Sequence, residues 1–340
     1  MAVALVFVLA LTGCRASNKQ LAAEPAVGVE FVMNTLVEQR WYGEHAQEAY
    51  DEIIASLRTL EQKLSLYVET GEIAQLNAAA GKAPVAVSKD VYQLLKAAVA
   101  CGEASDGAFD LTIAPLTLCW DIAGEHPHIP AQEEIDRARA LVDYRKLRLD
   151  DQAQTAFLEE PGMQVDLGGV AKGMAASAMR EIAQKHGVQG FLSIGGNMMV
   201  EGKKPDATDF RIGIRDPRAD QTEYIAVLAL DGLTMATTGD YERYFIENGV
   251  RYHHILDPFT GYPSQSDLIS VTVISENGTL ADCLSTTIFL QGSEALEHYF
   301  ARDDCMVLAV TRDKKVYATP ALWERLTVDP SKTDYTFCRE

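Results

Sequence analysis

A histidine and an aspartate stand three positions apart in a loop shaped by proline and glycine, R-Y-H-H-I-L-D-P-F-T-G-Y-P. They are His254 and Asp257, and Pro258 restricts the backbone of the aspartate that precedes it. Histidine titrates near neutral pH, so the pair is suited to take a proton from an attacking hydroxyl. A histidine in such a loop serves only as a hydrogen-bonding partner about as often as it serves as an acid or base. The spacing does not decide which of the two would be the base.

A carboxylate and a hydroxyl stand four positions apart in A-D-C-L-S-T-T-I-F, residues 281–289. This spacing places Asp282 and Thr286 on one face of a helix that we expect over 282–291. Both offer oxygen, the donor that Mg²⁺ prefers, and magnesium commonly accompanies phosphates. The segment indicates a magnesium site, for which the spacing alone is weak support.

Paired glycines stand between an expected strand and an expected helix in V-D-L-G-G-V-A-K-G-M-A, residues 165–175. We expect the strand to end at Asp166 and the helix to begin after Gly169. Free N–H groups and the positive end of the helix dipole would then face an anion, and Lys172 could add a point charge. The G-x-G-x-x-G fingerprint of dinucleotide-binding folds is absent, and a plain strand-to-helix turn is the alternative.

The loop S-D-G-A-F-D-L-T-I-A-P-L, residues 105–116, combines a tight turn with an aromatic and a carboxylate. Gly107 permits the turn, Phe109 offers an aromatic face, and Asp110 can accept hydrogen bonds from the amide edge of a ligand. By itself the segment is equally well explained as a loop that caps a helix.

The elements that must position these segments follow from the spacing of apolar residues. A long amphipathic helix is predicted over 46–66, where apolar residues recur every three or four positions. Further helices are expected over 88–101, with Ser88 as N-cap, and over 131–142, 170–186 and 293–301. Strands are expected over 27–37 (interrupted at 33–35), 146–149, 156–158, 225–230, 269–274 and 306–311. Helices early and strands late favour an α+β fold with one compact catalytic unit.

Composition excludes several classes of protein. The chain has 340 residues, 47% of them hydrophobic, and a formal net charge of −19. This apolar share excludes a disordered or fibrous chain. The acidic balance argues against a nucleic-acid partner, because phosphate contacts need clustered lysine and arginine. We interpret the charge as a solvated surface that keeps the protein soluble.

Residues 1–13 carry no charge and lead into Cys14 through L-T-G-C. The run is too short to span a bilayer, which needs about 20 residues, and has the length of a signal-peptide hydrophobic region. Its ending resembles a bacterial lipobox, although no lysine or arginine precedes the run, and a buried strand is the alternative. We expect a signal peptide over 1–13, lipidation of Cys14, a tether over 14–27 and an exported catalytic domain over 28–340. The lipid anchor would be the only contact with the membrane.

The other cysteines form no C-x-x-C pair, so neither a zinc site nor a disulfide-rich scaffold is expected. Most of them should be buried thiols, and a single disulfide is the remaining alternative. They are Cys101, Cys119, Cys283, Cys305 and Cys338.

In order and spacing, these segments together resemble the ApbE family of FAD:protein FMN transferases, from about Phe31 to the C-terminal region. Four positions depart from the residues usual in the family, namely Asn34, Gly71, Thr238 and Phe259, the last at a place that is often basic. The resemblance rests on M-N-T (33–35), L-S-L-Y (64–67), G-E-I-A-Q-L-N (71–77), G-A-F-D (107–110), D-L-G-G-V-A-K-G (166–173), S-I-G-G-N (193–197), A-T-T-G-D-Y-E-R-Y-F (236–245), the His–Asp–Pro loop and A-D-x-x-S-T (281–286).

The resemblance implies roles for single positions. It implies a metal, usually Mg²⁺, held by the backbone carbonyl of Gly169 and the side chains of Asp282 and Thr286. It implies that His254 and Asp257 lie close to the reacting diphosphate. It implies FAD contacts from Met33, Tyr67, Ala108, Phe109, Asp110, Asp166, Lys172 and Ile255.

The implied reaction is Mg²⁺-dependent transfer of FMN from FAD to a threonine hydroxyl of another protein, with release of AMP. The acceptor would carry a D-G-x-T-x-A-T-like motif and belong to a membrane redox complex matured on the exported side, the periplasmic face in a Gram-negative cell. This chain has a similar segment, D-G-L-T-M-A-T at 231–237, but it coincides with a family strand, so we do not expect self-modification at Thr234. The alternatives are a metal-dependent FAD pyrophosphatase and an FAD-binding lipoprotein without catalysis.

Overall fold

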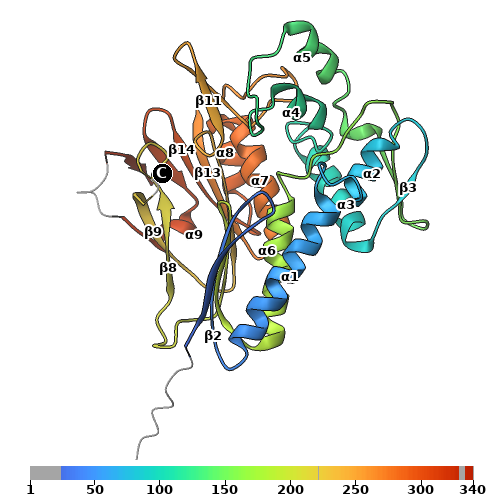
Figure 1. Ribbon diagram of the computed structural model, residues 1–340. Helices are drawn as coiled ribbons and strands as arrows, with labels where there is room; N and C mark the ends of the chain where they lie inside the picture. Colours follow the sequence, from blue (N-terminus) through green and yellow to red (C-terminus); the bar gives the residue numbers. More distant parts are fainter. Residues whose placement is uncertain (1–23, 221, 329–333, 340) are drawn as a thin grey trace, which may run out of the picture.

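A nine-stranded sheet runs through the structure, with helices on one face and a small sheet on the other (Figure 1). This computed structural model describes residues 24–220, 222–328 and 334–339. Neighbouring strands of the large sheet pair antiparallel, except that β15 and β17 are parallel. In spatial order the strands are β1 (Ala26–Val32), β2 (Thr35–Tyr42), β6 (Gln189–Ile194), β7 (Asn197–Glu201), β10 (Thr234–Gly239), β13 (Leu268–Ser275), β14 (Met306–Thr311), β15 (Lys315–Ala318) and β17 (Thr336–Cys338).

Three long helices cover one face of this sheet, namely α1 (Ala46–Leu64), α6 (Ala171–His186) and α7 (Gly278–Gln291). The predicted apolar stripe of α1 is buried, and Ile53 and Leu57 are fully inaccessible to solvent. Full burial of such a side chain contributes roughly 1.5–3 kcal/mol, so this stripe holds α1 against β1 and β2. The helices expected over 46–66 and 170–186 are therefore confirmed, with ends shifted by one or two residues.

The opposite face packs against a three-stranded sheet in the order β16 (Leu326–Thr327), β9 (Tyr224–Leu230) and β8 (Phe210–Arg215). Apolar residues alternate along β8 and share a core with Met235 and Leu308 of the large sheet. The alternation is what a strand with one buried face requires. The α+β fold class is confirmed.

The remaining elements gather beside the ends of α1 and α7, at the upper right of Figure 1, and along the sheet. Three of the helices, α2, α4 and α9, have no counterpart in the sequence prediction. The elements are α2 (Glu72–Ala78), β3 (Val85–Ala86), α3 (Lys89–Ala104), α4 (Ala114–Trp120), α5 (Gln132–Arg139), η1 (Tyr144–Lys146), β4 (Leu147–Asp150), β5 (Thr155–Leu158), β11 (Tyr244–Glu247), β12 (Val250–His253), η2 (Ser293–Ala295), α8 (Leu296–Phe300) and α9 (Pro320–Trp323).

The first strands form a hairpin, so the prediction of one interrupted strand over 27–37 is wrong. Val32 pairs with Thr35 across a two-residue turn. Met33 and Asn34 in this turn both have a φ of 55°. Positive φ at both positions is the signature of a type I′ turn, whose twist matches that of antiparallel strands. Methionine is not a typical residue for such a turn, which is why the sequence pattern did not indicate it.

Two local expectations also differ from the structure. The strand predicted to end at Asp166 is absent. In its place, Gln164 forms a single isolated β-bridge with Ile113. Ser88 does precede α3, but its hydroxyl bonds the carboxylate of Glu72 at 2.8 Å and makes no capping hydrogen bond.

One disulfide joins Cys101 of α3 to Cys283 of α7, with 6.6 Å between their Cα atoms. The described cysteines outside it are the thiols Cys119, Cys305 and Cys338. From the sequence, most cysteines were expected to be buried thiols, and a single disulfide was the alternative. Cysteines 182 positions apart meet here because α3 packs against α7.

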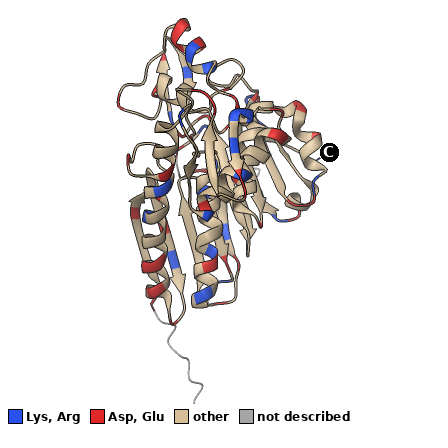
Figure 2. Cartoon of the chain, turned by 90° about the vertical axis from the view of Figure 1, so that its right-hand side faces the viewer, with Lys and Arg blue, Asp and Glu red and all other residues tan. Residues whose placement is uncertain are grey.

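The predicted signal peptide, Cys14 and most of the tether lie outside the described residues. Within the described ranges, no helix is both long and apolar enough to cross a membrane. Acidic and basic residues are interspersed over the helices that face the viewer in Figure 2. This distribution agrees with interpreting the net charge as a solvated surface.

Candidate active site

A pocket of about 390 Å³ brings together segments that are distant in the sequence. Its walls come from the β1–β2 turn, the end of α1, the start of α6, the end of β10, the His–Asp–Pro loop and α7. Asp257 is not among the lining residues, and Cys14 lies outside the described part. The predicted site residues that line the pocket are Met33, Tyr67, Ala108, Phe109, Asp110, Asp166, Gly169, Lys172, His254, Ile255, Asp282 and Thr286.

A close crossing of α6 and α7 places the carboxylate of Asp282 beside the start of α6. The helices meet at Gly173 and Gly278, where a Cβ on Gly173 would lie 2.1 Å from the carbonyl oxygen of Gly278. This approach lets the N–H of Gly173 donate to Oδ2 of Asp282 at 2.8 Å. The aspartate is 4% exposed, so the hydrogen bond offsets part of the cost of burying its charge. Among the described residues, none donates to its other oxygen, Oδ1.

Thr286 follows Asp282 by one helical turn and lines the same pocket. Its Oγ1 lies 3.2 Å from Oγ1 of Thr238, at the end of β10. A Cβ on Gly169 would lie 3.6 Å from Oγ1 of Thr286 and 2.9 Å from the ring of Phe109. Glycine at position 169 therefore leaves room for the phenylalanine ring and brings backbone close to the threonine hydroxyl.

Asp110 uses both carboxylate oxygens to hold its own loop. Oδ1 accepts hydrogen bonds from the N–H and the hydroxyl of Thr112 at 2.7 and 2.6 Å, and Oδ2 accepts one from the N–H of Tyr144 at 2.8 Å. Burial raises the pKa of Asp110 above its ordinary value, and the three donors oppose that shift. The carboxylate therefore shapes the pocket wall next to Phe109, and both of its oxygens accept hydrogen bonds from the protein.

Arg243 attaches the β1–β2 turn to the pocket. Its guanidinium donates to the carbonyl oxygen of Asn34 at 2.7 Å, and the N–H of Asn34 donates to Glu61 of α1 at 3.3 Å. These bonds fix the position of Met33 in the pocket wall. Asparagine tolerates the left-handed backbone of this turn better than most residues, which explains Asn34 where the family often has glycine.

The start of α6 is organised by two side chains of the D-L-G-G-V-A-K-G segment. Oδ1 of Asp166 accepts a hydrogen bond from the N–H of Gly168 at 2.8 Å, and Nζ of Lys172 donates to the Gly168 carbonyl at 3.0 Å. Opposite them, Tyr67 has 66% of its surface exposed. Desolvation and then the charge of Asp166 raise the pKa of Tyr67. An exposed aromatic ring at the edge of a pocket can stack on a planar ligand.

His254 is oriented by one backbone carbonyl. Its N–H and its ring Nδ1 lie 3.1 and 3.2 Å from the carbonyl oxygen of Arg243. A carbonyl only accepts, so Nδ1 carries the proton and Nε2 keeps the lone pair. The residue is exposed toward the pocket, while protein atoms crowd its other sides. This desolvation, followed by the charges of Arg243, His253 and Lys172, lowers the pKa of His254 below its ordinary value. The ring is therefore neutral at pH 7 and a weaker base than a histidine that titrates near neutral pH.

Asp257, the other candidate base, and His253, the residue before His254, make structural contacts instead. His253 is 4% exposed, its Nε2 lies 3.1 Å from the Ser264 carbonyl, and its Nδ1 accepts from the N–H of Ile255 at 3.3 Å. Oδ1 of Asp257 accepts from the N–H of Phe259 at 2.8 Å and closes the turn after the aspartate. Of the predicted pair, His254 alone lines the pocket.

The pocket lining carries more carboxylates than cations. Five carboxylates stand against the two basic side chains of Lys172 and Arg243. A diphosphate entering this site would add negative charge, so its binding requires a further cation. Nowhere in the described ranges do three or more His, Cys, Asp or Glu residues form a group that could hold a metal ion. The set implied by the resemblance has one carboxylate, one hydroxyl and one carbonyl, all oxygen donors of the kind that Mg²⁺ takes.

Sequence reasoning assigned no role to Arg243 or Thr238, although both line the pocket. Both belong to the quoted segment A-T-T-G-D-Y-E-R-Y-F. That motif is the feature of the sequence that could have identified these two residues. Their contacts with Asn34 and Thr286 depend on where β10 ends in the sheet, which the segment alone does not specify.

Comparisons with known proteins agree with this geometry. A family model described as the ApbE family matches residues 33–309. An FAD:protein FMN transferase from Klebsiella pneumoniae (strain 342) is 35% identical over 298 residues, which are 84% of this chain and 90% of that protein. One from Treponema pallidum (strain Nichols) is 32% identical over 320 residues, 88% of each chain.

Solved structures are similar over nearly their whole length. The crystal structure of the ApbE protein from Thermotoga maritima matches with a TM-score of 0.83 at 32% identity, over 89% of this chain and 99% of that one. The flavin transferase ApbE from Vibrio cholerae matches with a TM-score of 0.80 at 26% identity, over the same shares of the two chains.

Proposed function

Since this chain belongs to the ApbE family, we propose that it is an FAD:protein FMN transferase that moves FMN from FAD to a protein acceptor. One observation carries the proposal: a single pocket contains a neutral histidine, the start of α6 and the oxygen donors of α7. These are the groups that phosphoryl-group transfer needs, because such a reaction depends on positioning and on stabilising negative charge.

The proposed acceptor group is a threonine hydroxyl. Its oxygen attacks the phosphorus of the FMN half of FAD, the bond from that phosphorus to the bridging oxygen breaks, and AMP leaves with the bridging oxygen. Nε2 of His254 accepts the proton of the hydroxyl. Lys172 and Arg243 provide positive charge for the transferring group, whereas Asp257 stabilises its own turn.

The residues present fit a magnesium ion. The carbonyl of Gly169, Oγ1 of Thr286 and the carboxylate of Asp282 would hold it, and the oxygen of Asp282 without a donor is the natural ligand. When bound, the ion supplies positive charge to the diphosphate and to the leaving AMP. The excess of carboxylates in the pocket supports this requirement for a cation.

The acceptor is proposed to be a separate flavoprotein with a D-G-x-T-x-A-T-like motif, within a membrane redox complex. Thr234, in the similar segment of this chain, is fully buried in β10, so its hydroxyl cannot reach the pocket of another copy while the chain is folded. This burial supports the expectation that the chain does not modify itself.

The proposal is tested by incubating residues 15–340 with FAD, Mg²⁺ and an acceptor that carries the motif. We expect flavin fluorescence on the acceptor band in a denaturing gel and one AMP for each flavin transferred. AMP without a labelled acceptor would instead identify an FAD pyrophosphatase. The observation that favours this alternative is that Tyr67 and His254 are exposed, so water can reach the pocket. If FAD binds and neither product forms, the protein is an FAD-binding protein without catalysis.

Export and lipid anchoring at Cys14 are proposed from the sequence alone. Radiolabelled palmitate should be incorporated into the expressed full chain and not into its Cys14→Ser variant. Incorporation into both proteins would contradict an anchor at Cys14.

A further inference from the structure

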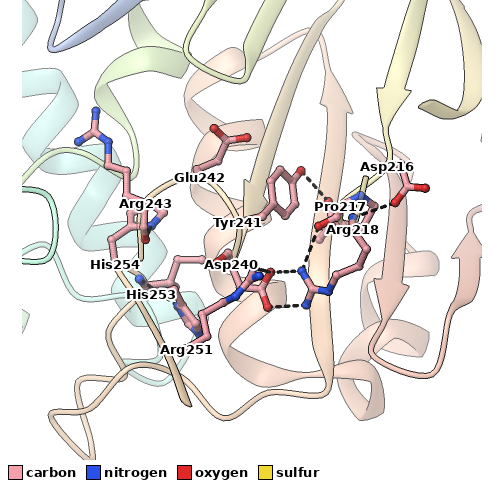
Figure 3. A network of polar contacts seen from close by, with 12 residues as sticks. Asp216, Pro217, Arg218, Asp240, Tyr241, Glu242, Arg243, Arg251, His253 and His254 are labelled. Carbon is pink, nitrogen blue, oxygen red and sulfur yellow. Dashed lines mark hydrogen bonds and ion pairs between the residues drawn. The ribbon is translucent and has the colours of Figure 1, made fainter. Parts of the chain in front are cut away.

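A buried ion pair lies behind the candidate base, outside the pocket lining. Asp240 lies in the bend between β10 and β11, with its side chain 8% exposed. Its carboxylate accepts two hydrogen bonds from Arg218, both at 2.7 Å. Arg251 of β12 approaches the same carboxylate at 3.5 Å and the Asp240 carbonyl oxygen at 3.4 Å. In Figure 3, Arg218 meets Asp240 from one side, and Arg243 and His254 lie on the other.

The three members of this cluster come from different parts of the fold. Arg218 belongs to the β8–β9 connection of the small sheet, and Asp240 follows β10 of the large sheet. Along the chain, Asp240 precedes Arg243 by three positions, and Arg251 precedes His254 by three positions. Asp240 therefore restrains both partners of the bond between the Arg243 carbonyl and the His254 ring.

The bend between Asp240 and Arg243 is restrained along its whole length. The hydroxyl of Tyr241 lies 3.3 Å from Oγ of Ser270 in β13, and Arg215 of β8 pairs with Glu242 at 3.0 Å. These contacts leave the Arg243 carbonyl little freedom to move as long as the bend stays in place. The bidentate pair is the strongest of them, because both groups are charged and the aspartate is buried.

We infer that Asp240, held by Arg218, is a positioning residue that fixes the Arg243 carbonyl and through it the tautomer and direction of the His254 ring. Neither Asp240 nor Arg218 lines the pocket, so neither is expected to touch FAD. The catalytic part of this inference rests on the proposed function, since it takes His254 as the base. Removing the charge of Asp240 leaves the Arg218 guanidinium without a charged partner and removes the strongest restraint on the bend.

The first test measures FMN transfer by the Asp240→Asn variant. A displacement of the base by about 1 Å can cost up to roughly 100-fold in rate. We expect kcat to fall about 10- to 100-fold, with KM and the dissociation constant for FAD within about twofold of wild type. Arg218→Lys keeps the charge but loses the two-point contact, so it should lie between wild type and Asp240→Asn.

The ion pair of Arg180 and Glu201 is a matched control. The two side chains are 3.2 Å apart and largely buried, with 15% and 20% of their surface exposed. Neither residue lines the pocket. Glu201→Gln should lower the melting temperature and leave kcat unchanged. If Glu201→Gln and Asp240→Asn reduce kcat equally, the effect is general destabilisation and the inference is wrong.

A double-variant cycle separates positioning from a wider structural role. If Asp240 acts only through His254, then adding Asp240→Asn to His254→Ala should cause no further loss of kcat. A further loss as large as in the wild-type background would overturn the inference.

A second readout does not need activity. In ¹⁵N NMR of histidine-labelled protein, the His254 signals, assigned with His254→Gln, should show a proton on Nδ1 in the wild type and mixed tautomers in Asp240→Asn. The Nδ1 tautomer persisting unchanged in Asp240→Asn would contradict the inference. A wild type that binds FAD but neither labels the acceptor nor releases AMP would reject the proposed function instead, and the NMR comparison would then decide the positioning role alone.

Discussion

Replacing Gly173 by alanine should disturb the site from a position outside the pocket lining. The added Cβ would lie 2.1 Å from the Gly278 carbonyl oxygen and 2.6 Å from the Cβ of Asp282. Both neighbours belong to α7, whose backbone cannot rotate away as a side-chain end can. The helices must therefore separate by about 1 Å to restore ordinary contact distances.

The cost follows from three contributions. Overpacking of this kind costs about 1–3 kcal/mol. Lengthening the hydrogen bond from the Gly173 N–H to the charged Asp282, now 2.8 Å, costs about 1.5–3 kcal/mol. The better helix propensity of alanine returns at most about 1 kcal/mol. The free energy of unfolding should fall by roughly 1.5–5 kcal/mol, which for about 300 residues lowers the melting temperature by roughly 2–8 °C.

The assay combines thermal unfolding with titration of FAD in the presence and absence of Mg²⁺. Because Asp282 moves away from the start of α6, we expect Gly173→Ala to lose most of the Mg²⁺-dependent gain in FAD affinity. Ser177→Ala is the control on the same helix: it removes the 2.9 Å hydrogen bond from the Gly278 N–H without adding volume, so the crossing distance should persist. Wild-type melting temperature together with wild-type Mg²⁺ dependence in Gly173→Ala would refute the reasoning.

Four further results are expected. Asp282→Ala should abolish FMN transfer in the in-gel fluorescence assay, and an unchanged rate would remove Asp282 from the proposed metal site. EDTA should weaken FAD binding sharply, measured by flavin fluorescence, since the pocket itself carries an excess of carboxylates; equal affinity with and without EDTA would exclude a metal requirement for binding. Cys101→Ser should lower the free energy of unfolding by about 2–5 kcal/mol, because the disulfide closes a loop of 182 residues. Denaturant unfolding measures this difference. Equal stability of Cys101→Ser and the wild type would show that the disulfide is not formed. The pKa of His254 is lowered, so its neutral form persists as pH falls, and kcat/KM for FAD should change little between pH 7.5 and 5.5, whereas a base of ordinary pKa 6.5 would lose about tenfold.

Sequence patterns predicted the elements that depend on local spacing. The apolar stripe of α1 is visible as residues three and four apart, and burial of one helix face makes that spacing necessary. Asp282 and Thr286 share a face of α7 for the same geometric reason. The β1–β2 hairpin was not predicted, because its turn uses Met33 and Asn34 at left-handed φ without glycine. Helices α2 and α4 are seven residues each, too short for a clear period.

The roles within the His–Asp–Pro loop needed tertiary contacts. The sequence left open whether His254 or Asp257 is the base, with a slight preference for His254 because histidine titrates near neutral pH. The structure separates them because Asp257 accepts the N–H of Phe259, whereas His254 is held by Arg243 and lines the pocket. Arg243 itself was not predicted, since its carbonyl and guanidinium act on residues 11 and 209 positions away.

By itself the sequence determined which residue types are present and which of them share a helix face or a tight turn, because both depend on a few consecutive backbone angles. It also carried the family resemblance, through motifs in a fixed order. Only the tertiary structure decided that α6 and α7 cross at two glycines, that Cys101 meets Cys283, and that Asp240 restrains the support of His254. Each of these joins residues far apart in the chain, and such contacts arise from packing of the whole sheet and its helices, which no local pattern encodes.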